Sequence, residues 1–100
     1  MKIKLHKLKK GKESKWFAWC LLLMTDLKKD ALESIKEEKL SFEGAGSFEL
    51  NGETYVLGIM EGEGFPANMK KEINKKHIEM RKECLDDSIK VEMNYELYNK

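Results

Sequence analysis

The dipeptide Asn51-Gly52 lies between two runs of alternating residues, 40–50 and 53–61, near the middle of the chain. A type I′ turn needs positive φ at both central residues, and Asn-Gly adopts this conformation more readily than other pairs. Residues 40–50 and 53–61 are therefore predicted to form an antiparallel hairpin. In the second run apolar residues occupy both parities, which is typical of a central strand covered on both faces.

Helical and strand patterns flank this hairpin on each side. Apolar residues recur at helical spacing over 12–38 and 67–87, and residues alternate with period two over 2–9 and 89–98. The predicted order is strand, helix, strand, strand, helix, strand, which is the ferredoxin-like split β-α-β arrangement (βαββαβ) of the α+β class. We expect one domain over residues 1–100, with a four-stranded antiparallel sheet in the order 4-1-3-2 and both helices on one face.

Charge and hydrophobicity exclude several classes of protein. Charged residues make up 37% of the chain and the formal net charge is +1, so we expect no nucleic-acid partner. The apolar run 16–24 is far shorter than the ~20 residues that a membrane span needs, and no small-residue cleavage site of a signal peptide follows it. We expect a cytoplasmic protein with no membrane partner, whose two cysteines are free thiols.

Period-two alternation assigns the strand residues to the two faces of the predicted sheet. The apolar set is expected to lie beneath the helices and contains Ile3, Leu5, Leu40, Phe42, Val91, Met93 and Tyr95. The open face is then polar and carries Lys4, His6, Ser41, Glu43, Glu92, Asn94 and Glu96. This face is either a solvated surface or, because the third strand is apolar on both sides, the place where two copies pack as a homodimer around a hydrated or ligand-filled lumen.

Two histidines are the candidate catalytic residues. His77 lies in the apolar stripe of the second predicted helix, where it is either an acid or base that works near pH 7 or a packing residue with one hydrogen-bonded nitrogen. His6 alternates onto the polar face, where it is either part of an acid/base or ligand-binding cluster or a surface residue. Two histidines on separate elements, without an HExxH or CxxC motif, predict no metal site.

The C-terminal part of the chain contains a distinctive pattern. Segment 77–85 has a histidine, a hydrophobic residue three positions later and Cys-Leu near its end, and the alternating run 91–97 follows. Together with the basic first strand, Trp16 and the acidic residues before Leu40, this pattern resembles a small uncharacterised bacterial family with a domain-of-unknown-function label. That family is similar in layout to the dimeric α/β-barrel superfamily, which includes antibiotic-biosynthesis-type monooxygenases, stress-responsive barrel proteins and sugar mutarotases. The resemblance implies this fold and a dimer, and it implies no activity.

No catalytic or ligand-binding motif identifies a reaction, so the function is predicted only as a class. The first hypothesis is a small-molecule-binding dimeric α/β-barrel that uses the open sheet face and needs no cofactor. The alternatives are a cofactor-independent enzyme, monooxygenase-like or isomerase-like, that uses His6 or His77, and a purely structural or regulatory dimerisation module. The candidate ligand-binding residues are Lys4, His6, Glu43, Tyr55, Glu92 and Asn94.

Overall fold

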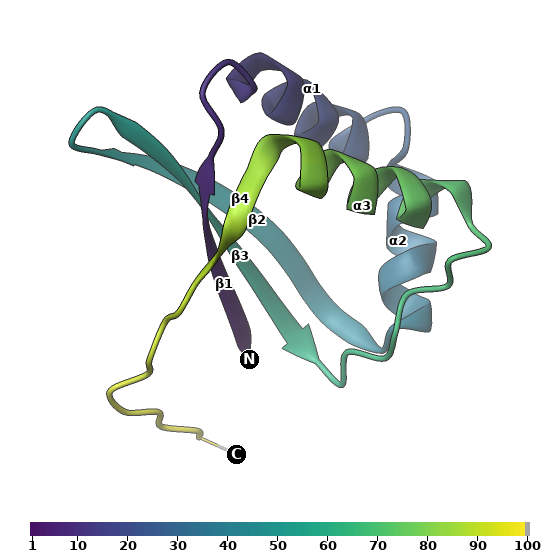
Figure 1. The fold of residues 1–100 in the computed structure, drawn as a ribbon. Coiled ribbons are helices and arrows are strands. Elements are labelled where there is room, and N and C mark those ends of the chain that lie inside the picture. Colours follow the sequence, from purple (N-terminus) through teal and green to yellow (C-terminus); the bar gives the residue numbers. More distant parts are fainter. Residues whose placement is uncertain (100) are drawn as a thin grey trace.

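The computed structural model describes residues 1–99 as two layers, a sheet and three helices that cover one of its faces (Figure 1). The strands are β1 (Lys2–Leu8), β2 (Leu40–Leu50), β3 (Glu53–Gly62) and β4 (Leu85–Ile89), and the helices are α1 (Glu13–Met24), α2 (Lys28–Glu37) and α3 (Glu72–Cys84). The element order is β-α-α-β-β-α-β, so the prediction of one helix between the first two strands is wrong. Among residues 1–99 there is no helix with the length and hydrophobicity to cross a membrane.

The sheet is antiparallel throughout, with its strands in the order β2-β3-β1-β4. This is the predicted order, read from the opposite edge. The hairpin between β2 and β3 also forms as predicted, because Leu50 pairs with Glu53 across Asn51 and Gly52, whose φ angles are 53° and 77°. Asparagine and glycine accept these positive angles at little cost, so the turn fixes the register of the two strands.

Three residues, 25–27, interrupt the long helix predicted after the first strand. At the end of α1 the Thr25 hydroxyl donates to the Leu21 carbonyl (2.8 Å), and the Leu27 amide donates to the Leu22 carbonyl (2.9 Å). These bonds use the carbonyls of the last helical turn, so the helix ends and α2 begins in a new direction. Two short helices therefore cover the sheet where one was predicted (Figure 1).

The second predicted helix begins later than expected. A turn precedes α3: Asn68 Oδ1 accepts the Lys70 amide (3.0 Å) and the Asn68 carbonyl accepts the Lys71 amide (3.1 Å). Asparagine side chains stabilise such turns in competition with a helix. The segment between β3 and α3 is therefore an extended connection that runs along one end of the domain (Figure 1).

The last predicted strand is mostly absent. β4 ends at Ile89, and residues 90–99 follow it as an exposed segment without regular secondary structure. In Figure 1 this segment leads away from the sheet. The prediction of a strand over 89–98 is wrong for most of that range, because an alternating sequence forms a strand only where a neighbouring strand can pair with it.

Strand β1 presents to the helices the face opposite to the predicted one. Leu8 is buried in the core, and alternation puts Lys4 and His6, which share its parity, on the same side of the sheet. Both residues line a cavity beneath the helices, together with Glu43 of β2. The predicted polar open face is therefore wrong, since these polar side chains point into the space between the two layers.

The open face of the sheet is apolar instead. Residues directly opposite each other in an antiparallel pair share a face, and Leu5 is opposite both Leu57 of β3 and Ile89 of β4. A register shift at the start of β2 puts Phe42 on this face as well, over Gly44. The open-face cluster, as we call it, comprises Ile3, Leu5, Phe42, Phe48, Tyr55, Leu57, Ile59 and Ile89.

The core lies between the sheet and the helices. Trp16 and Trp19 of α1 are 4% and 2% exposed, so they pack in the core. Large aromatic side chains of this kind dominate the burial of apolar surface in a small domain. The buried cluster consists of Leu8, Trp16, Trp19, Val56, Ile73, Met80, Cys84 and Leu85.

Candidate functional site

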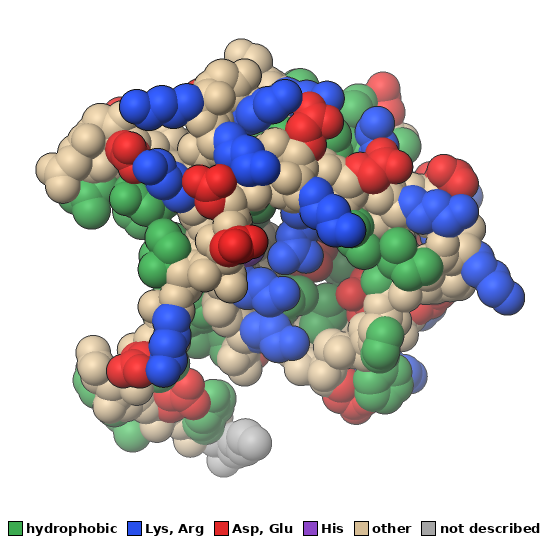
Figure 2. Space-filling view, in the orientation of Figure 1, with side chains coloured by type: hydrophobic (Ala, Val, Ile, Leu, Met, Phe, Trp, Pro, Cys, Tyr) green, Lys and Arg blue, Asp and Glu red, His purple; other side chains and the backbone are tan. Residues whose placement is uncertain are grey.

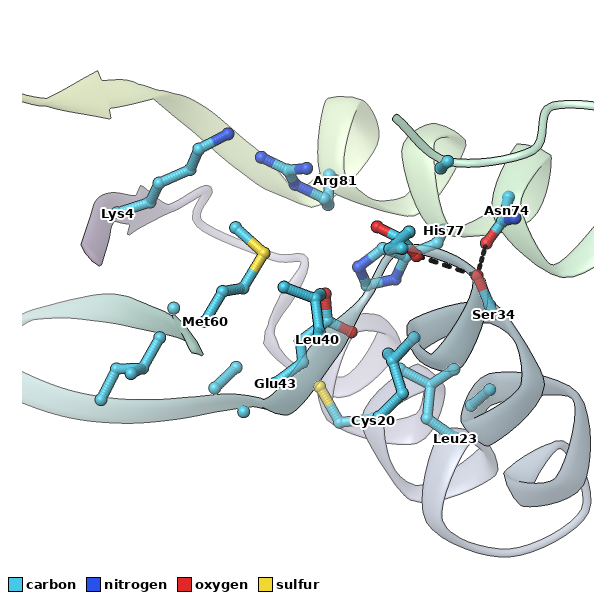
Figure 3. Close-up of a pocket in the computed structure, with 18 of the residues that line it drawn as sticks. Lys4, Cys20, Leu23, Ser34, Leu40, Glu43, Met60, Asn74, His77 and Arg81 are labelled. Carbon is cyan, nitrogen blue, oxygen red and sulfur yellow. Dashed lines mark hydrogen bonds between the residues drawn. The ribbon is translucent and has the colours of Figure 1, made fainter. Parts of the chain in front are cut away.

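A cavity of about 550 Å³ lies between the helix-covered face of the sheet and the three helices (Figure 3). This volume is within the range of pockets that hold small organic ligands, about 300 to 1,000 Å³. Cys20 and Leu23 of α1, Ile35 of α2, and Leu40 and Met60 of the strands contribute apolar walls. The interior can therefore enclose the apolar part of a ligand.

Two small residues form the floor of the cavity. Ala45 of β2 and Gly58 of β3 are directly opposite each other, and Gly58 is also opposite Lys4 of β1. A Cβ added to Gly58 would meet only the Lys4 carbonyl oxygen, at 3.9 Å, which is an ordinary contact. Gly58 also lies outside the positive-φ region, so neither backbone conformation nor crowding requires glycine there. What the missing side chain provides is space.

His77 projects from α3 into the cavity (Figure 3). The Trp19 indole N–H donates to His77 Nδ1 (2.9 Å), so the hydrogen of the neutral ring is on Nε2. Burial, and then the nearby Arg81 guanidinium, lower the pKa of His77 to about 4. The ring is therefore neutral near pH 7, and its Nε2–H group is a hydrogen-bond donor rather than a base.

His6 reaches the cavity wall from the sheet. Its Nδ1 donates to the Asp86 carbonyl of β4 (2.8 Å), since a carbonyl oxygen can only accept. Its Nε2 is buried and has no hydrogen-bond partner in the described part of the chain. Buried ring nitrogens usually have a partner, so this atom is an exception among the described residues.

Two glutamates lie at the inner end of the cavity. The Ser34 hydroxyl of α2 lies 2.6 Å from Asn74 Oδ1 and 3.0 Å from Glu38 Oε2, and its contact with Asn74 joins α2 to α3. Glu43 is exposed as a whole residue, but its carboxyl group lies over the cavity beside Leu40 (Figure 3). Burial of that carboxyl, and then the charge of Glu38, raise the pKa of Glu43. Glu43 is therefore the carboxyl group here that is best suited to exchange a proton.

Lys4 and Arg81 face each other across the rim of the cavity (Figure 3). They come from different layers, Lys4 from β1 and Arg81 from α3. Burial lowers the pKa of Lys4, and the positive charges of Arg81 and Lys2 lower it further. Figure 2 shows basic side chains gathered beside a hollow in this face of the molecule, below α3. The rim is therefore cationic, whereas the interior is mainly apolar.

Of the six ligand-binding residues predicted from the sequence, three line the cavity, namely Lys4, His6 and Glu43. Tyr55 lies on the opposite face, where its ring stacks on Phe48 with 5.3 Å between centroids. Glu92 and Asn94 are in the exposed segment after β4 and do not join the sheet. The predicted polar face with Lys4, His6, Glu43, Glu92 and Asn94 is therefore wrong, because β1 is turned over and the last strand is short.

The sequence prediction missed Arg81, Ser34 and Gly58. Arg81 follows His77 by four residues and so shares its helix face, which is a signal that could have identified it. Nothing in the local sequence marks Ser34 or Gly58. Among residues 1–99 no three His, Cys, Asp or Glu side chains are grouped so that they could hold a metal ion.

A family model matches residues 1–99, which is nearly the full chain. The chain belongs to the DUF6176 family. This DUF6176 family is described as a family of unknown function, so the predicted resemblance to an uncharacterised domain family is confirmed at that level. No curated protein and no solved structure matches the DUF6176 chain.

Proposed function

We propose that this DUF6176 chain binds a small organic molecule in the cavity between its sheet and its helices. The observation that carries the proposal is Gly58, in the central strand β3, where a side chain would fit and none is present. Glycine within a strand costs stability, and it often marks a place where another molecule approaches the backbone closely. The empty floor is therefore best explained by an occupant.

Polar groups from separate elements also support a binding site. Lys4 and His6 of β1, Glu43 of β2, and His77 and Arg81 of α3 all line the same cavity. Apolar pockets with a few convergent polar groups, some of them with shifted pKa values, are the usual form of small-molecule sites. The apolar walls supply affinity in such a site, and the polar groups fix the orientation of the ligand.

Titration with N-phenyl-1-naphthylamine, a neutral dye that fluoresces in apolar surroundings, tests the proposal. We expect saturable binding with one site per chain. Gly58→Leu fills the floor and is expected to weaken binding at least about 30-fold, because the dye and the new side chain compete for the same space. Gly46→Leu is the matched control, since it adds the same side chain on the open face, where a Cβ would meet no atom within 4 Å.

The two variants give opposite outcomes only if the dye binds in the cavity. Unchanged binding in Gly58→Leu, or equal losses in both variants, would exclude the cavity as the site. Absence of any bound dye or metabolite would favour the purely structural or regulatory module. Circular dichroism establishes that both variants retain the fold before their affinities are compared.

We further propose that two copies associate through the open face, in the manner of the dimeric α/β-barrels with a ferredoxin-like layout. The strand order is the one expected of a split β-α-β domain, with a first crossover made of two helices. Phe42 and Phe48 of the open-face cluster are 50% and 44% exposed, and a contiguous apolar surface of this kind marks an interface. A second copy presents the same cluster by two-fold symmetry. Sedimentation equilibrium tests the association, and a monomer at every accessible concentration would exclude it.

We also propose a cytoplasmic location. Cys20 and Cys84 are both free thiols, and free thiols persist in a reducing compartment. Rapid alkylation during cell lysis is therefore expected to label both cysteines once the chain is unfolded. A Cys20–Cys84 disulfide found in the same experiment would contradict this location.

A cofactor-independent enzyme is the second candidate function. The observation that favours it is Glu43, whose pKa is raised by burial and by Glu38 and which lines the same cavity as His77, a neutral hydrogen-bond donor. A carboxyl group with a raised pKa is better suited than an ordinary glutamate to accept and return a proton. The acid/base role predicted for His6 or His77 then belongs to Glu43. Glu43→Gln is expected to abolish turnover of a bound substrate while leaving its binding intact, and retained turnover would exclude this function.

A further inference from the structure

Building on the proposed binding function, we infer that the ligand is an amphipathic organic anion whose head group binds between Lys4 and Arg81 and whose apolar body extends over Gly58. The two cations are at the rim and the small floor residue is beneath the apolar interior. A ligand that satisfies both regions needs a negative charge at one end and hydrocarbon or aryl surface at the other.

The two rim cations repel each other. Arg81 and Lys2 both disfavour the charged form of Lys4 and lower its pKa, after burial as the largest cause. Among residues 1–99 no carboxylate forms an ion pair with Lys4 or Arg81, whereas Lys7 pairs with Glu53. An anion between the two cations would remove this repulsion and gain charge-assisted hydrogen bonds, for which the guanidinium offers a planar fork.

Neither Glu38 nor Glu43 forms an ion pair with Lys4 or Arg81 in the described part of the chain. Glu38 is near the Ser34 hydroxyl (3.0 Å) at the inner end, where α2 meets α3. The pKa of Glu43 is raised, because burial and Glu38 outweigh the opposing charge of Arg81. A negative head group is therefore favoured at the rim and disfavoured at the inner end, which gives the ligand one orientation.

The apolar body has a continuous path inward from the rim. Met60 lies beside the two cations, and Leu40, Cys20 and Leu23 follow it toward α1 (Figure 3). His77 contributes one neutral N–H donor along this path. Medium-chain fatty acids and aryl carboxylates combine a compact anionic head with a body of this kind.

Displacement of the bound neutral dye by three probes of equal chain length tests the head group. Decanoate, 1-decanol and decylamine are compared below the concentrations at which they form micelles. We expect decanoate to bind at least about 10-fold more tightly than decanol, because it gains charge-assisted hydrogen bonds, and decylamine to bind most weakly. The probes differ only in the charge and hydrogen bonding of one end, so the ratio reports the rim alone.

The double variant Lys4→Met/Arg81→Met removes the rim charges while keeping apolar side chains of similar length. It is expected to weaken decanoate binding about 30-fold and to leave decanol binding unchanged. Lys36→Met/Lys76→Met removes two exposed positive charges elsewhere and is expected to retain the preference for decanoate. Arg81→Lys keeps the charge and is expected to retain most of the preference for decanoate. This variant tests the rim charge even if the double variant does not fold.

The outcomes separate this inference from the proposed function. If the wild-type chain binds neither dye nor decanol, both the proposed binding function and the inference of an anionic ligand are wrong. If it binds the dye in the cavity but decanol displaces the dye as well as decanoate does, the proposed binding function is retained and the inference of an anionic ligand is wrong. Equal loss of the decanoate preference in the two double variants would also overturn the inference, since general charge rather than the rim would then set the preference.

Discussion

The helix-covered face of the sheet carries Lys4, His6 and Glu43 around a cavity, whereas the open face carries apolar residues such as Leu5 and Leu57. In most two-layer antiparallel domains the covered face is apolar and the open face is polar. The proposed ligand on the covered face and the proposed second copy on the open face would each account for this difference.

The covered face contains buried polar groups that lower the stability of the folded chain, and the open face does not. Lys4 holds a partly buried charge beside Arg81, and His6 Nε2 is buried without a partner. Groups of this kind destabilise a folded chain unless a ligand satisfies them, and binding sites commonly trade stability for function in this way. Exposed apolar residues on the open face carry a different cost, which the proposed association with a second copy would remove.

Charging the open face is expected to have the largest effect. Leu5 and Leu57 are directly opposite each other, so Leu5→Glu/Leu57→Glu places two like charges at the centre of the proposed interface. We expect the dissociation constant of the dimer to rise at least about 1,000-fold, which corresponds to about 4 kcal/mol. Sedimentation equilibrium measures this change, with Ala18→Glu on the exposed side of α1 as the control. Unchanged association of the double variant would show that the open face is not the interface.

On the covered face, His77 is expected to make stability depend on pH. Its pKa is about 4 in the folded chain against an ordinary value of 6.5, so the unfolded chain binds more protons between these values. Stability therefore falls as the pH falls from 6.5 to about 4, by up to about 3 kcal/mol. Urea unfolding of His77→Gln, whose amide oxygen can still accept from Trp19, is expected to lack this part of the loss.

Comparison of the two proteins at each pH isolates His77 from other groups. Glu43 has a raised pKa and so contributes stability of the opposite sign as the pH falls, but it does so in both proteins. The expected result is a wild-type curve that falls more steeply than that of His77→Gln. Parallel curves would mean that His77 is not neutral and buried in the folded chain.

Substitutions at two neighbouring residues of β3, one on each face, are expected to have a smaller effect on stability. Val56 is 2% exposed in the core, whereas Leu57 belongs to the open-face cluster. Val56→Ala is expected to cost about 2 kcal/mol of unfolding free energy at any protein concentration. Leu57→Ala is expected to cost less than about 1 kcal/mol in dilute solution and more at high concentration, where the dimer contributes to stability. Denaturant titrations at two concentrations distinguish these patterns.

The smallest expected effect is a gain in stability. Lys4→Met removes a charge that Arg81 and partial burial disfavour, and it is expected to raise the unfolding free energy by about 0.5 to 1 kcal/mol. Lys36→Met, at an exposed position on α2, is expected to change stability by less than about 0.5 kcal/mol. Thermal unfolding measures both. A destabilised Lys4→Met would mean that the lysine has a stabilising role in the unliganded chain.

The sheet order and the central hairpin could be predicted because local chemistry determines them. Asn51-Gly52 specifies one turn, and that turn fixes the register of two strands. The faces of β1 could not be predicted in the same way. Ile3 and Leu5 suggested an inward apolar face, and only Leu8, at the end of the strand, belongs to the parity that packs in the core. Alternation identifies two faces, but it does not say which one meets the helices.

The remaining errors depend on contacts that are distant in the sequence or absent from a single chain. The break in the helix at 25–27 contains neither proline nor glycine, so no residue type there predicts it. Residues 90–99 alternate as a strand does, but β4 ends before them. Half of the predicted ligand-binding residues line the cavity. Gly58 could not be predicted from its local sequence, because its role in the cavity depends on the helices that lie opposite it.

Ala45 and Gly58 have a consequence for selectivity. The floor of the cavity is made by a methyl group and by a residue without a side chain, so no rotamer change there can deepen it. A series of guests of equal length should therefore be sorted by thickness, with tight acceptance up to one cross-section and abrupt rejection beyond it. The size of the residue at position 58 would then set this limit, which a single mutation could change without altering the fold.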